Sequence, residues 1–134
     1  MTSLLEDIHE KNPEEIKKEL QRLQELLEKE PTRADVLLEI SSCLRHLNNY
    51  EEVLKVHEQL ITLYPENFEY KFMKGIVMFE CGKYTEALPV FDELLALDPT
   101  NRDVLFNKAL VLKSLNRQQE AKELMKLALR RAEK

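Results

Sequence analysis

Histidine and cysteine, the side chains that most often carry catalysis or bind metals, are few in this sequence and do not cluster. The three histidines are His9, His46 and His57, and the two cysteines are Cys43 and Cys81. No CxxC pair occurs, and a glycine-rich phosphate loop, an HExxH helix and a nucleophile elbow are also absent. The sequence therefore predicts no catalytic site, no metal site and no cofactor, with both thiols packed in the fold.

Composition and charge narrow the class of protein further. The chain has 134 residues, of which only two are glycine, and its long Glu-, Lys- and Leu-rich stretches favour helices. A net charge of −5 disfavours a nucleic-acid binder, which normally presents a basic face. The first residues do not form a signal-peptide pattern, and no apolar run approaches a membrane span. We therefore expect an all-α, cytoplasmic protein that binds neither nucleic acid nor membrane.

Proline recurs at a fixed interval along the chain. Pro31, Pro65 and Pro99 are each separated by 34 residues, and each follows a helical pattern that it ends. Thr32 and Thr100 are each followed three residues later by an aspartate, a spacing that predicts capping boxes. The period predicts seven helices, at residues 12–29, 33–47, 50–63, 67–81, 84–97, 101–115 and 118–132.

Within each period, the same residue types return at equivalent positions. The middle of the first helix has a small residue, and the turn has a residue that tolerates a left-handed backbone. The small position holds Ser41, Gly75 and Ala109, and the turn holds Asn48, Gly82 and Asn116. One face of the second helix holds Val53, Ala87 and Ala121, then His57, Phe91 and Met125, then Leu60, Leu94 and Ala128. We expect three antiparallel helix pairs, with His57 packed inside the first.

This pattern resembles the tetratricopeptide repeat. The middle period matches the family at Gly75, Gly82, Tyr84, Ala87, Phe91 and Pro99. The resemblance implies an antiparallel helix-pair solenoid that winds into a right-handed superhelix, with the first helices lining its concave side. It also implies one structural domain with repeats at residues 34–67, 68–101 and 102–134. A degenerate half-repeat at residues 1–33, whose helix begins after Asn12, would cap the array.

The last repeat is expected to end the array. It has Lys122 and Arg131 where earlier repeats have leucines, and a terminal repeat needs a polar outer face because nothing further covers it. The cations of the last helix also complement its dipole. Leu127 departs from this polar pattern. It is expected either to contact a partner or a second copy of the chain, or to have no role.

The resemblance places a candidate peptide-binding groove on the first helices. Its residues are Leu38, Ser42, Arg45, Phe72, Met73, Ile76, Phe79, Phe106, Asn107, Leu110 and Lys113. Phe72, Ile76 and Phe79 form one stripe, and a second apolar stripe on the same helix faces its own repeat. A helix that is apolar on nearly all sides is either buried or covered by a partner. The rings therefore either pack against neighbouring helices or bind a partner, and we favour the partner.

One known binding site of the family is expected to be missing. The carboxylate clamp, which grips the C-terminal tail of heat-shock chaperones, needs lysine, arginine and asparagine side chains. Its positions here hold Leu38, Ser42, Met73, Asp103 and Asn107, none of which is a cation. We therefore expect no role as a heat-shock chaperone adaptor.

Three functions stay open, none of them enzymatic. The favoured function is a protein–protein interaction module, an adaptor or scaffold that binds an apolar peptide or amphipathic helix in the groove. The first alternative is a small dedicated chaperone resembling the tetratricopeptide chaperones of bacterial type III secretion. The second alternative is a structural homo-oligomer whose groove is filled by a second copy of the chain.

Overall fold

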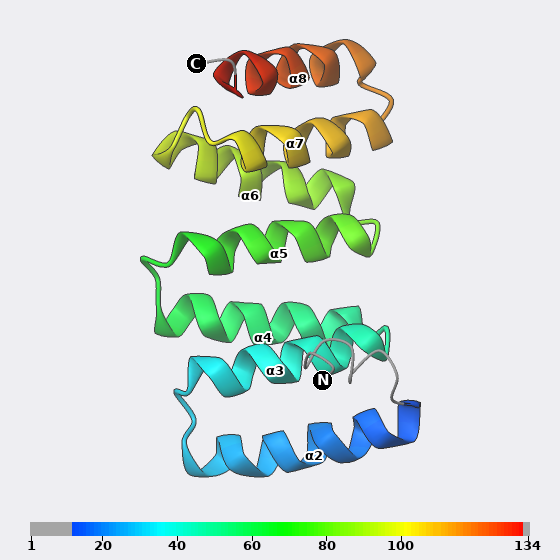
Figure 1. Cartoon of the computed structure of the whole chain (residues 1–134), viewed down its shortest axis with the longest axis vertical. Helices are drawn as coiled ribbons and strands as arrows, with labels where there is room; N and C mark the ends of the chain where they lie inside the picture. Colours follow the sequence, from blue (N-terminus) through cyan, green and yellow to red (C-terminus); the bar gives the residue numbers. More distant parts are fainter. Residues whose placement is uncertain (1–11, 133–134) are drawn as a thin grey trace. The chain divides into compact units, whose positions relative to one another are not determined.

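The computed structural model describes residues 12–132, which form seven α-helices and no strand (Figure 1). The helices are α2 (Pro13–Lys29), α3 (Ala34–His46), α4 (Tyr50–Leu63), α5 (Phe68–Glu80), α6 (Tyr84–Leu97), α7 (Arg102–Ser114) and α8 (Gln118–Ala132). Each lies within one residue of its predicted bounds. The segment that precedes Asn12 in the predicted half-repeat lies outside the described residues.

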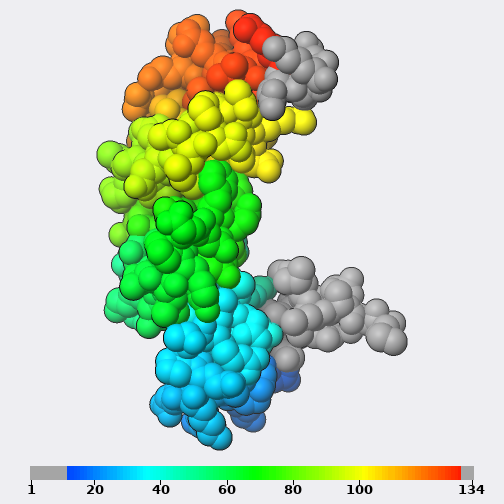
Figure 2. Space-filling model, turned by 90° about the vertical axis from the view of Figure 1, so that its left-hand side faces the viewer, coloured from blue at the N-terminus to red at the C-terminus, as the bar shows by residue number. Residues whose placement is uncertain are grey.

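The chain divides into two compact units, an N-terminal unit of residues 1–65 and a C-terminal unit of residues 66–134. In the N-terminal unit, α3 packs against both α2 and α4. In the C-terminal unit, α7 packs against α5, α6 and α8, and consecutive helices run antiparallel (Figure 1). Figure 2 shows the same layers on the surface of the C-terminal unit, from α5 in green to α8 in orange and red. The N-terminal unit thus contains α2 and one helix pair, and the C-terminal unit contains two helix pairs.

The turns inside the helix pairs have the left-handed backbone that the sequence predicts. Asn48, Gly82 and Asn116 have φ angles of 59°, 82° and 61°. The residue after each turn donates its N–H back into the first helix, as Lys83 does to the Met78 carbonyl at 2.8 Å. This bond is typical of a helix that ends in a left-handed residue. The chain therefore reverses at the same point of each repeat.

The predicted capping box at Thr100 is wrong, because α7 begins one residue later. Asn101 is the N-cap, and its side-chain Oδ1 accepts a hydrogen bond from the Val104 N–H at 3.1 Å. In the same way, Asn67 caps α5 by accepting from the Tyr70 N–H at 3.0 Å. Asparagine satisfies a free amide of the first helical turn as well as threonine does.

The predicted capping box at Thr32 is also wrong. The N-cap of α3 is Arg33, which makes no side-chain cap. Its guanidinium instead pairs with Asp35 at 2.6 Å and with Glu30 at 2.8 Å. The hydrogen bonds from Arg33 hold the pKa of the exposed Asp35 carboxyl below its usual value. Asp35 therefore pairs with Arg33 rather than completing a capping box. By contrast, the predicted cap of α2 is confirmed, since the Glu15 N–H donates to Asn12 Oδ1 at 2.9 Å.

The small residue of each first helix faces a large residue of its second helix. A Cβ atom on Gly75 would lie only 2.7 Å from Cε1 of Phe91, whose side chain is fully buried. In the third repeat, Met125 packs against the buried cluster that contains Ala109. A larger residue on one helix is thus matched by a smaller one on the other, as close packing requires.

The equivalent pair in the first repeat is polar. His57 is fully buried, as expected, and its Nε2 lies 3.0 Å from the Ser41 hydroxyl. Its Nδ1 has no hydrogen-bond partner among the described residues. Burial first, and then the positive charge of Arg45, lowers the pKa of His57 to about 4. The ring is therefore neutral at physiological pH.

Candidate functional site

Helix α5 carries four of the predicted groove residues, and all four are half-buried. They are Phe72, Met73, Ile76 and Phe79. The Phe72 ring meets Phe91 edge-on, with ring centres 6.2 Å apart, and the Phe79 ring lies 5.6 Å from that of Tyr84. Both phenylalanines pack against the buried cluster of the second repeat. Each ring therefore contacts the core on one side and reaches the surface only in part.

Helix α7 carries four more of the predicted groove residues, namely Phe106, Asn107, Leu110 and Lys113. Phe106 is 48% exposed, more than any other aromatic side chain of residues 12–130. Leu110 is half-buried and Lys113 is exposed. The Asn107 amide donates to the Asp103 carbonyl at 2.8 Å, one turn earlier in the same helix. Because α5 and α7 are in contact, these residues belong to neighbouring first helices of one unit.

Helix α3 of the N-terminal unit carries the remaining three predicted groove residues. Leu38, Ser42 and Arg45 are all half-buried. The Ser42 carbonyl accepts a hydrogen bond from Nδ1 of His46 at 2.8 Å. The His46 ring is therefore held against its own helix.

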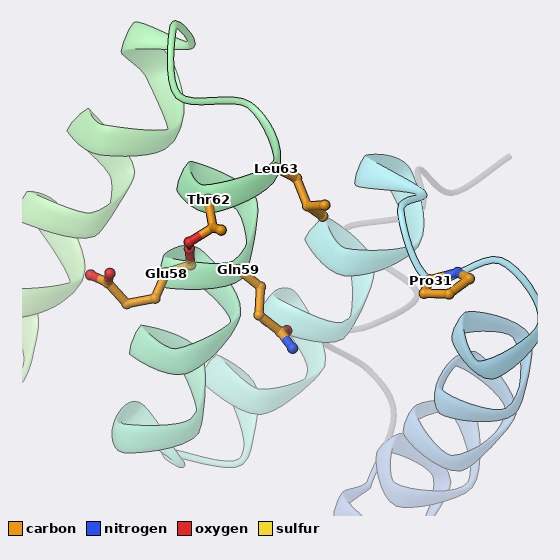
Figure 3. A pocket seen from close by; sticks show the side chains of 5 residues that line it. All are labelled: Pro31, Glu58, Gln59, Thr62 and Leu63. Carbon is orange, nitrogen blue, oxygen red and sulfur yellow. The ribbon is translucent and has the colours of Figure 1, made fainter.

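Two pockets of the N-terminal unit were not among the predicted sites. One, of about 340 Å³, is lined by Pro31, Glu58, Gln59, Thr62 and Leu63. Figure 3 shows Gln59 and Leu63 extending from α4 on the side of Pro31, whereas Glu58 extends the other way. The second, of about 350 Å³, shares Gln59 and includes Leu37, Ile40 and Leu44 of α3 between α2 and α4. The apolar residues of α2 and α4 predicted that these helices pack in the fold. They did not predict that a pocket lies between the two helices.

A third pocket, of about 360 Å³, lies between α7 and α8 in the C-terminal unit. Its apolar residues are Ala109, Ala121, Met125 and Leu129, and its polar residues are Lys113, Gln118, Lys122 and Lys126. Of these, only Lys113 was predicted as a site residue. The sequence signal for the pocket is the pair Lys122 and Lys126, which stands where the preceding repeat has Leu88 and Asp92.

Residues 12–132 contain no group of three or more His, Cys, Asp or Glu side chains placed to hold a metal ion. Cys43 is buried and Cys81 half-buried, and neither forms a disulfide within residues 12–132. Over the same stretch of chain, no helix is both long and apolar enough to cross a membrane.

Comparison with known proteins identifies the repeat. Two family models of the tetratricopeptide repeat match the sequence, one at residues 49–102 and the other at residues 78–134. This chain is a tetratricopeptide repeat protein. The two matches together extend from the start of α4 to the end of the chain, so they include all of the second and third repeats.

Solved structures of MamA have the same fold. MamA 41-end from Desulfovibrio magneticus RS-1 matches with a TM-score of 0.73 and 22% identity, covering 87% of this chain and 66% of that one. Another MamA crystal structure has a TM-score of 0.75 and 15% identity, covering 88% of this chain and 64% of the other. The tetratricopeptide chain thus spans slightly less than two thirds of these MamA chains. No curated protein matches its sequence.

The MamA similarity establishes an all-α helical repeat solenoid. The tetratricopeptide repeat is a non-catalytic fold that binds other proteins, so this chain is a protein–protein interaction module.

Proposed function

We propose that this tetratricopeptide protein is an adaptor that captures an apolar peptide or an amphipathic helix of a partner on α5 and α7. The observation that carries the proposal is the 48% exposed ring of Phe106, at the position equivalent to Phe72 in the preceding repeat. Aromatic side chains are enriched among the residues that dominate binding at protein interfaces. Ile76 and Leu110, one turn after these two rings, extend the apolar surface along each helix.

The energy available to such a surface sets the expected affinity. Fully burying one phenylalanine side chain stabilises a complex by roughly 1.5–3 kcal/mol. Because Phe106 is already about half-buried, binding would add about half of this energy. Ordering a flexible peptide costs part of this energy. Several contacts must therefore add to Phe106, and we expect micromolar rather than nanomolar binding. Lys113, one turn beyond Leu110, would pair with a carboxylate of the partner.

The test compares two serine substitutions at exposed apolar residues. Phe106→Ser removes the proposed anchor, and Leu97→Ser removes a 68% exposed side chain at the end of α6, away from the proposed surface. Partners are captured from a native lysate, and the affinity of each purified partner is then measured by calorimetry. We expect Phe106→Ser to weaken binding about tenfold or more and Leu97→Ser to leave it unchanged, with both variants retaining the helical circular dichroism signal.

If Phe106→Ser and Leu97→Ser bind every partner alike, the binding surface is not on α7. Phe72 is left intact in this test because its contact with Phe91 would mix a loss of stability with a loss of binding.

A further inference from the structure

The second helix of the middle repeat has a face that the next first helix covers. Asp92 of α6 pairs with Lys108 of α7, with Oδ1 and Nζ 2.6 Å apart. Leu88 and Leu95, on the same side of α6, pack against buried clusters that include residues of α7. The face formed by Leu88, Asp92 and Leu95 is therefore the seat of the following helix.

Two valines of α7 fill this seat. Val104 and Val111 are fully buried in one cluster with Ala87 and Phe91 of α6. They are seven residues apart and so lie on one stripe of α7, with Lys108 between them. A helix that fits this seat therefore has two apolar side chains two turns apart. Between them it has a charged side chain, whose sign is opposite to that of the charge on the seat.

Helix α8 is the last layer of the C-terminal unit within the described residues (Figure 1), and its equivalent face is exposed. At the positions of Leu88, Asp92 and Leu95, 34 residues further along the chain, it has Lys122, Lys126 and Leu129. All three line the 360 Å³ pocket, together with the buried Ala109 and Ala121. Leu129 is 60% exposed. The pocket is thus in the position that Val104 and Val111 fill in the preceding repeat.

We propose that this end face docks an acidic amphipathic helix of a partner protein. Asp92 pairs with a lysine of the following helix, so Lys126, at the equivalent position, requires a carboxylate on the docking helix. Lys122 requires a second carboxylate, one turn away on the same docking helix. Lys113, at the edge of the same pocket, adds a third positive charge. Within the described part of the chain, none of these three lysines forms an ion pair. They stand out from a protein whose net charge is −5.

The probe is a peptide with the sequence of residues 101–117, which contains the helix that occupies the preceding seat. The acidic peptide has Lys108→Glu and Leu112→Glu, so that its carboxylates face Lys126 and Lys122 in the antiparallel arrangement of α6 and α7. The basic peptide has Leu112→Lys and retains Lys108. Both keep Val104 and Val111, so they present the same apolar stripe and differ only in charge. A single exposed ion pair contributes little to the binding energy. The comparison of the two peptides therefore sets two attractions to Lys122 and Lys126 against two repulsions.

We expect the acidic peptide to bind at least tenfold more tightly than the basic peptide at low salt, measured by fluorescence anisotropy. The preference should shrink as salt screens the charges. Lys122→Glu/Lys126→Glu should reverse it, while Lys18→Glu/Lys29→Glu, an equal change of net charge at exposed sites in the N-terminal unit, should preserve it. Because the whole protein is negative, non-specific attraction would favour the basic peptide instead.

Equal binding of the two peptides, or an acidic preference that survives Lys122→Glu/Lys126→Glu, would overturn the proposal. A homodimer in light scattering that the same two substitutions dissociate would also overturn it, because the face would then belong to a second copy of the chain. Phe106→Ser should bind the acidic peptide as the wild type does. The test therefore does not depend on Phe106, the anchor of the proposed groove on α5 and α7.

Discussion

His57 takes, in the first repeat, the position that Phe91 has in the second, and its ring is buried in a neutral form. Burial first, and then the charge of Arg45, lowers its pKa to about 4, whereas an unfolded chain titrates near 6.5. Between these values the unfolded state binds a proton that the folded state does not. The free energy of unfolding should therefore fall as the pH decreases from about 6.5 to about 4, by up to roughly 3 kcal/mol, and then level off.

The double variant Ser41→Ala/His57→Met tests this pH dependence, because it copies the Ala109 and Met125 pair of the third repeat. Urea denaturation at pH 7 and pH 4.5 measures the free energy of unfolding of both proteins. We expect the wild type to lose roughly 2 kcal/mol more than the variant over this interval. The carboxylates titrate in both proteins, so the difference isolates His57. Equal losses would mean that the ring is not held neutral by burial.

Gly75 is required by the close approach of Phe91, and the same residue pair sets the stability of the second repeat. Since even a Cβ at this position would lie 2.7 Å from the buried ring, Gly75→Leu should destabilise the protein by roughly 3 kcal/mol. The combination Gly75→Ala/Phe91→Met, which reproduces the Ala109 and Met125 pair of the third repeat, should retain more stability than Gly75→Ala alone. Melting temperatures check both statements, and an unchanged value for Gly75→Leu would contradict the close contact.

At the scale of the helix, the N-caps stabilise the starts of α5 and α7. Removing the Asn101 side chain leaves the Val104 N–H without its partner, so Asn101→Ala should cost about 1 kcal/mol of stability. Thr100→Ala, one residue earlier, should have little effect, because Asn101 provides the cap. Chemical denaturation of the two variants measures this difference. A larger loss for Thr100→Ala than for Asn101→Ala would restore the capping box that the sequence predicted.

At the scale of the whole molecule, the charges of the first helices determine which peptides we expect the proposed groove to exclude. The carboxylate-clamp positions Leu38, Ser42, Met73, Asp103 and Asn107 provide no cation for a terminal carboxylate. A peptide that ends in the acidic tail of the heat-shock chaperones should therefore show no micromolar binding in calorimetry. The same peptide with an amidated C-terminus is the control. Tight binding that amidation removes would show that the chain does have a carboxylate clamp.

The sequence alone determined the helices, their order and the turns between them. The 34-residue period, the prolines and the left-handed residues Asn48, Gly82 and Asn116 act through the local backbone, so their effect does not depend on distant parts of the chain. The small position at Ser41, Gly75 and Ala109 also indicated where two helices approach closely. For the same reason His57 could be placed inside the fold, at a position otherwise taken by Phe91 and Met125.

The tertiary structure alone decided what covers each helical face. Periodicity placed Phe72, Phe79 and Phe106 on corresponding stripes, but the first two rings contact Phe91 and Tyr84 while Phe106 stays 48% exposed. The caps depended on where each helix begins to within one residue, which the sequence pattern could not resolve. The pocket between α7 and α8 could not be predicted from the sequence either. Residue spacing determines which side chains share a face, but it does not determine how near the next helix lies.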